Sequence, residues 1–141
     1  MKIVIFGAQG YALGAYEALK ALYPKRVVPF FLVTKIGNNA SELGEIPVRE
    51  IVSVSREMSR EEKLSFEVII ATPENAQPEI EETLENYGFR HYSRLDSERW
   101  GELMKMFHIK LDRFLPLSAL PVGYNKPFVR IYIWRSLIRT D

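Results

Sequence analysis

The sequence predicts an α/β fold built on a mostly parallel, doubly wound sheet. The chain opens on the segment 2–6, which is apolar at every position except Lys2 and leads into the glycine-containing loop 7–14. A helical pattern of apolar residues follows this loop, and further apolar runs alternate with helical patterns up to about residue 95. Because such alternation is typical of parallel sheets covered by helices on both faces, we expect a three-layer α/β/α, Rossmann-like domain over residues 1–95.

The first elements are predicted from apolar periodicity. Residues 2–6 form a strand, because a strand buried on both faces is apolar at nearly every position. The following helix ends before Pro24. A second strand is expected over about 27–33, with Pro29 at the start or edge of the pairing because proline donates no ladder hydrogen bond. The apolar face of the first helix carries Ala12, Tyr16, Leu19 and Tyr23.

The middle of the chain gives weaker signals. Residues 37–39 indicate a loop, and residues 45–48 predict a short third strand at best. Between 49 and 65 the sequence predicts only a short helix, which begins after Ser59 because Glu62 stands at capping-box spacing.

The second half of the domain is predicted more firmly. The run 66–71 is a buried strand, and a helix spans about 76–87. Pro78 suits the first turn of that helix and Gly88 suits its C-terminal exit. Residues 89–92 predict a fifth strand.

Residues 96–141 form a C-terminal extension rather than a second domain. A helix begins near Asp96 and carries an apolar face. After a linker-like stretch, 114–127, the run 128–134 is strongly β-prone. We expect this extension to pack back on the domain or to join a second copy, giving a homodimer through residues 128–134. The apolar face of the helix consists of Trp100, Leu103, Met104, Phe107 and Leu111.

Composition excludes several classes of function. The net charge is +1 with both signs interspersed, so no basic stripe for nucleic acid is present. The absence of cysteine excludes disulfides and thiolate chemistry. No signal-peptide pattern or long apolar run occurs, so we expect a cytoplasmic protein without a membrane span.

The loop after the first strand departs from the dinucleotide-binding pattern G-x-G-x-x-G/A. The first glycine is Gly7 and the last position is Ala12, but Gln9 stands where the backbone must approach a pyrophosphate. Gly10 can partly compensate by shifting the turn. The start of the helix, near Gly10 and Tyr11, still favours an anion because its N–H groups are free.

Two further loops are expected at the same edge of the sheet. Thr34 and Lys35 follow the second strand, where NAD sites usually carry an acidic residue, and Lys35 suits a phosphate better than a ribose. Thr72 and Pro73 follow the strand 66–71. Asn75 either caps the next helix or, like Thr72, hydrogen-bonds a base or sugar. An alternative is that these loops belong to a scaffold that holds no ligand.

No catalytic residue is predicted. Tyr16 and Lys20 match a dehydrogenase spacing but lie on the wrong helix. His91 and His108 lack metal-ligand spacing. No motif assembles a nucleophile, a base and an oxyanion donor, and no metal site is expected.

Three segments together resemble a known group of modules. They are KIVIFGAQGYALGAYEALK, FLVTKIGNNASELGEIPV and VIIATPENAQPEIEETLENYGF. The chain is similar to the amino-terminal Rossmann-like modules of bacterial capsular polysaccharide glycosyltransferases and of sugar-nucleotide acetyltransferases. The resemblance implies that Gly7, Gly10 and Thr72 lie near a nucleotide.

From residues and resemblance together we expect a nucleotide or nucleotide-sugar binding module for surface-polysaccharide synthesis that is not catalytic alone. Its ligand would be a phosphate-containing small molecule such as a nucleoside diphosphate or a UDP-sugar, with NAD(P) less favoured. The alternatives are a fragment of an NAD(P)-dependent oxidoreductase or epimerase, and a ligand-free structural or oligomerisation module.

Overall fold

The sheet confirms the predicted fold class. The computed structural model describes residues 2–114, which form an α/β fold around a six-stranded sheet of order β3-β4-β2-β1-β5-β6. All pairings are parallel except that of β3 with β4, so the sheet is mixed and Rossmann-like. The strands are β1 (Lys2–Phe6), β2 (Phe31–Val33), β3 (Glu42–Leu43), β4 (Ile46–Glu50), β5 (Phe66–Ile70) and β6 (Tyr92–Arg94).

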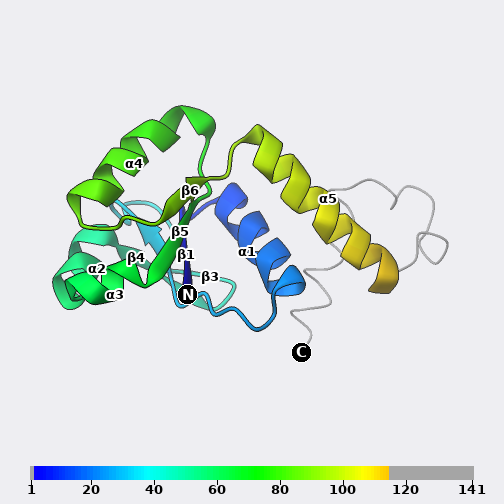
Figure 1. Ribbon diagram of the computed structural model, residues 1–141, viewed down its shortest axis with the longest axis horizontal. Helices are drawn as coiled ribbons and strands as arrows, with labels where there is room; N and C mark the ends of the chain where they lie inside the picture. Colours follow the sequence, from blue (N-terminus) through cyan, green and yellow to red (C-terminus); the bar gives the residue numbers. More distant parts are fainter. Residues whose placement is uncertain (1, 115–141) are drawn as a thin grey trace.

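Helices cover both faces of the sheet (Figure 1). On one face lies α1 (Gly10–Leu22), with α5 (Ser97–Phe114) beside it. The other face packs against α2 (Ile51–Glu57) and α4 (Gln77–Asn86). The short helix α3 (Arg60–Leu64) has no buried residue, and the 3-10 turn η1 (Glu74–Ala76) leads into α4.

Alternation along β1 divides the core into two halves. Ile3 and Ile5 face the α1 side, and Val4 and Phe6 face the α2 and α4 side, each at most 4% exposed. This is why the strand is apolar at consecutive positions, since both of its faces are covered by helices.

Alanine residues let α1 lie close to its neighbours. Ala12 and Ala15 pack on the sheet, while Ala18 and Ala21 pack against Met104, Phe107 and Leu111 of α5. The predicted apolar face of α5 is therefore confirmed, and the helix lies against α1 (Figure 1). Tyr23, which we expected on the core face of α1, is instead 44% exposed because the helix ends at Leu22.

Two predicted helix ends are confirmed by their capping hydrogen bonds. Ser59 and Glu62 form a complete capping box at the start of α3. At the end of α4, Gly88 has a φ of 90°, the N–H of Phe89 donates to Leu84 O, and that of Gly88 donates to Glu85 O. This paired pattern is the Schellman motif, which needs a left-handed residue that glycine supplies without strain.

Two predicted strands are placed wrongly by the sequence pattern. The second strand begins at Phe31 rather than near residue 27, because Pro29 precedes the ladder and Val27 is 59% exposed. The fifth predicted strand, 89–92, is replaced by β6 (Tyr92–Arg94). Phe89 belongs to the end of α4 and is buried in the core, so pairing with β5 can only start later.

The middle of the chain is more ordered than the sequence predicts. Residues 42–50 form the hairpin β3–β4, whose two turn residues, Gly44 and Glu45, both have positive φ. β4 then pairs in parallel with β2. The helix α2 was not predicted, and Ile51 and Val54, three residues apart, fix it by entering the core.

Some expectations fall beyond the described part of the chain. The rest of the linker-like stretch, the β-prone run 128–134 and the contact expected between two copies all lie outside residues 2–114. Within that range, no helix has the length and apolar character needed to cross a membrane.

Candidate functional site

The point where the strand order reverses lies between β1 and β5. β1 pairs with β2 on one side and with β5 on the other, so the strands predicted over 2–6 and 66–71 are neighbours in the sheet. In open α/β sheets, ligands bind outside the carboxyl ends of the strands at such a switch point. The loops after β1 and β5 therefore flank the place where a ligand is expected.

A hollow of about 850 Å³ opens at this edge. The ends of β1 and β2 contribute Phe6 and Val33 to its lining, and Ala71 follows β5. Its volume falls within the roughly 300–1,000 Å³ that is usual for small-molecule sites. The predicted site residues that line it are Gly7, Gln9, Gly10, Tyr11, Thr34, Lys35, Thr72 and Pro73.

Asn75 is the predicted site residue that the structure leaves out. It is exposed within η1 and does not line the hollow. The predicted cap is also wrong, because Ala76 is the N-cap of α4 and no side chain caps that helix. A side chain that caps a helix usually belongs to the residue just before it, whereas Asn75 lies inside the 3-10 turn that precedes α4.

Gly7 is required by the close approach of the first loop to β5. Its φ is 136°, and a Cβ at this position would lie 2.6 Å from Ala71 O and 3.2 Å from the Cβ of Ala12. The first glycine of the pattern and the alanine at its last position therefore act together, since both keep the loop and α1 close to the sheet.

Gln9 does not block the start of α1. It is the N-cap residue, with extended backbone and no side-chain hydrogen bond to the helix. Its exposed amide instead donates from Nε2 to Oδ1 of Asn39, at 3.3 Å. The first N–H groups of α1 therefore have no side-chain cap, and a Cβ on Gly10 would meet no atom within 4 Å.

The charge of the hollow is positive. Lys35 is exposed and forms no ion pair within the described residues, and no aspartate or glutamate lines the hollow. The loop that carries Lys35 is held in place by a hydrogen bond, in which the N–H of Ile36 donates to Glu50 Oε2 at 2.9 Å. The uncapped helix start adds about half a positive charge.

Half of the sixteen residues that line the hollow were not predicted as site residues, among them Asn39, Gly14 and Trp100. Asn39 comes from the 37–39 loop, and Gly14 and Trp100 lie on α1 and α5. The sequence placed Trp100 on the apolar face of its helix, and the indole does pack against the core, but it also reaches the hollow. Only the packing of α5 on α1 brings Trp100 to the site, so no local signal could have found it.

A buried glutamine fixes the far wall of the hollow. Gln77 is 1% exposed, and its Nε2 donates to the carbonyl oxygens of Thr72, at 2.9 Å, and Leu95, at 3.1 Å. These two carbonyls belong to the loops after β5 and β6. Gln77 is therefore a positioning residue that sets the conformation of the loop containing Thr72.

Glu74 joins the same loop to α5, and this contact predicts a pH effect. The Ser97 N–H and O–H both donate to Glu74 Oε1, and these bonds lower the pKa of Glu74 below its ordinary value of 4.5. The ionised carboxylate is favoured by folding, so the stabilisation is complete above the ordinary pKa and is lost as the pH falls through the lowered value.

We therefore expect Glu74→Gln to unfold at a lower temperature than the wild type at about pH 6, with the difference shrinking toward about pH 3. Thermal unfolding across this pH range measures the effect. Glu79→Gln, at an exposed position of α4, is the control and should show the wild-type acid dependence. A constant gap between Glu74→Gln and wild type at every pH would contradict the assignment.

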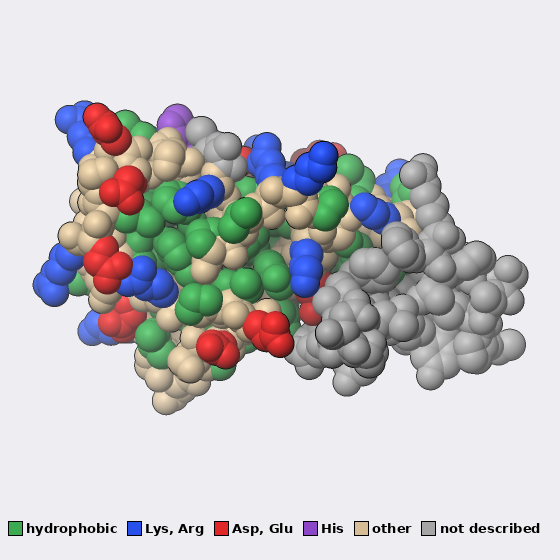
Figure 2. All heavy atoms as spheres, turned by 90° about the horizontal axis from the view of Figure 1, so that it is seen from below, with side chains coloured by type: hydrophobic (Ala, Val, Ile, Leu, Met, Phe, Trp, Pro, Cys, Tyr) green, Lys and Arg blue, Asp and Glu red, His purple; other side chains and the backbone are tan. Residues whose placement is uncertain are grey.

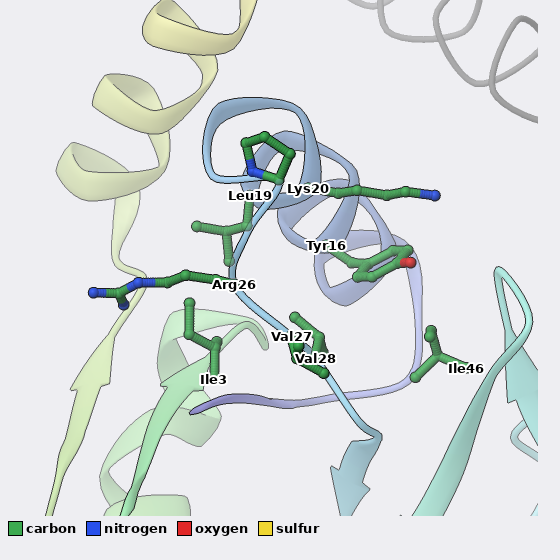
Figure 3. A pocket seen from close by; sticks show the side chains of 9 residues that line it. Ile3, Tyr16, Leu19, Lys20, Arg26, Val27, Val28 and Ile46 are labelled. Carbon is green, nitrogen blue, oxygen red and sulfur yellow. The ribbon is translucent and has the colours of Figure 1, made fainter. Parts of the chain in front are cut away.

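A second, smaller hollow lies at the opposite edge of the sheet. It measures about 230 Å³ and is bounded by apolar residues near the start of β1, including Ile3, Val27 and Val28. Lys20 and Arg26 extend outward from it in opposite directions (Figure 3). Hydrophobic side chains gather in the middle of this lower side of the molecule, with charged side chains around them (Figure 2).

Comparison with known proteins adds no relative. No protein-family model matches the chain, and neither the curated proteins nor the solved structures contain a match. The functional argument therefore rests on the site itself.

Proposed function

We propose that this protein binds a nucleotide or a nucleotide-sugar in the hollow between β1, β2 and β5, as a binding module for surface-polysaccharide synthesis without catalysis of its own. One observation carries the proposal. A ligand-sized hollow at the switch point combines the uncapped start of α1 with Lys35 and is lined by no carboxylate.

Charge supports a position for the phosphate end of the ligand at the start of α1. Backbone N–H groups at a helix start bind anions, and the open space beside Gly10 leaves room for a phosphate to approach the backbone. Lys35, on the loop after β2, lines the same hollow and adds a positive charge.

A nucleotide-sugar is favoured over NAD(P) by the residues that follow β2. Exposed Thr34 and Lys35 stand there, where NAD sites carry an acidic residue for the ribose. Gln9 also departs from the dinucleotide pattern, but the diphosphate of a UDP-sugar would meet the same side chain. The resemblance to modules of polysaccharide enzymes supports the sugar-linked class.

Ligand binding is tested on the full chain by thermal unfolding and by calorimetry with UDP, a UDP-sugar, ADP and NAD. We expect UDP or the UDP-sugar to raise the melting temperature most, since a ligand at 100 times its Kd adds about 2.7 kcal/mol of stability. Stronger binding of NAD would favour the oxidoreductase fragment instead. No response to any of the four would leave only an empty scaffold.

Lys35→Ala should weaken UDP binding by about three- to tenfold, because an exposed ammonium contributes a modest, screened attraction to a phosphate. Calorimetry at two salt concentrations measures this, and the variant should also lose part of the salt dependence. Lys25→Ala is the matched control, because Lys25 is an exposed lysine that does not line the hollow. Equal losses from both variants would mean that Lys35 does not contact the ligand.

A further inference from the structure

We infer that Trp100 and Tyr11 form the wall against which the flat base of the ligand stacks, so that the site selects nucleotides over other phosphates. This inference rests on the proposed function and adds the two residues that determine which phosphate-containing ligands the site prefers. It also makes α5, which follows the six-stranded sheet in the chain, a part of the binding site.

Trp100 packs directly against the backbone of α1, because Gly14 has no side chain there. A Cβ on Gly14 would lie 2.9 Å from Cη2 of Trp100, so the indole reaches the helix backbone where a side chain would hold it off. Trp100 also packs against the core around Leu103. The ring is therefore held in one place while part of it lines the hollow.

Tyr11 stands beside it at a right angle. The two ring centres are 5.0 Å apart with an interplanar angle of 82°, which is the preferred edge-to-face geometry of aromatic pairs. Tyr11 is nevertheless 50% exposed and lines the same hollow. A large aromatic surface that is held in place yet left uncovered is the kind of platform on which bases stack.

The lining of the hollow offers both features that a nucleotide needs. Lys35 and the uncapped helix start supply positive charge, and the aromatic pair supplies ring surface. A nucleoside diphosphate carries an anionic pyrophosphate at one end and a flat ring at the other. Inorganic pyrophosphate or a sugar phosphate has no flat ring to stack, so the aromatic pair should discriminate against both.

Fluorescence of the full chain tests the inference directly. The sequence has two tryptophans, so Trp134→Phe leaves Trp100 as the only indole. In this protein we expect UDP and ADP to quench the fluorescence with a saturable dependence, and inorganic pyrophosphate to bind without quenching. Trp100→Ala should weaken UDP about tenfold while leaving pyrophosphate unchanged, and Trp100→Phe should recover most of the loss, since stacking on aromatic rings contributes at this level.

Tyr23→Ala is the control, because Tyr23 is an exposed aromatic beyond the other end of α1. It should bind UDP like the wild type. UDP binding that is seen by calorimetry, leaves the Trp100 signal unchanged and is as tight in Trp100→Ala as in the parent would overturn the stacking wall but not the proposed function. If calorimetry detected no binding of UDP, ADP or pyrophosphate, the proposed function would be overturned, and the stacking wall with it.

Discussion

Gly7→Ala should lower the free energy of unfolding by about 3 kcal/mol or more, because the new methyl group meets both backbone strain and overlap. The φ of 136° disfavours any side chain, and the added Cβ would lie 2.6 Å from Ala71 O, which belongs to the backbone and cannot rotate away. Urea unfolding measures the loss as a lower midpoint, with an unchanged slope of the free energy of unfolding against urea concentration.

Gly10→Ala is the matched control three residues along the same loop. A Cβ there meets no atom within 4 Å, and Gly10 is the first residue of α1. We expect its stability to equal that of the wild type or to exceed it by up to about 1 kcal/mol, since alanine restricts the unfolded chain more than glycine does. If the two variants lost the same stability, the close approach of Gly7 to Ala71 could not be the cause.

Gln77→Glu should lower the free energy of unfolding by about 3 kcal/mol, because a carboxylate would replace the buried donor that bonds two loop carbonyls. The carbonyl oxygens of Thr72 and Leu95 would then face a negative charge at a position that is 1% exposed. Denaturant unfolding measures the loss. Acidification that protonates the introduced carboxylate should recover part of the stability, because the protonated group can donate one hydrogen bond.

Gln77→Met separates the two contributions. It keeps the volume but supplies neither donor nor charge, so its loss should be smaller than that of Gln77→Glu at neutral pH and should not vary between about pH 5 and pH 8. Equal losses from the two variants at neutral pH would show that the buried charge adds nothing to the missing hydrogen bonds.

The sequence predicted the parts of the fold in which local pattern and burial agree. Strand β1 is apolar from Ile3 to Phe6 and β5 is apolar from Val68 to Ile70, so their type and place followed from the local pattern alone. The hairpin β3–β4 was missed because its turn, Gly44-Glu45, is not one of the strong hairpin dipeptides. The helix α2 was missed because its β-branched residues favour no helix until Ile51 and Val54 enter the core.

The candidate-site residues that the sequence predicted follow the carboxyl ends of the strands. Loops after neighbouring parallel strands must meet, and this placed Gly7, Lys35 and Thr72 together before any coordinates. Trp100 and Gln77 could not be found in this way. Trp100 reaches the hollow through the packing of α5 on α1, and Gln77 holds the loop containing Thr72 while also bonding Leu95, 18 residues away. Neither spacing nor propensity reports these contacts.

The alanine residues of α1 have a consequence for how the site would work. Alanine has no rotamers to freeze, so contacts of Ala12, Ala15 and Ala18 fix the helix through its backbone. The amides at its start can then shift only if the whole element does. The proposed anion subsite would therefore be preorganised, and a ligand would lose little ordering entropy there, so its association rate should be governed by diffusion and charge rather than by an isomerisation of the protein.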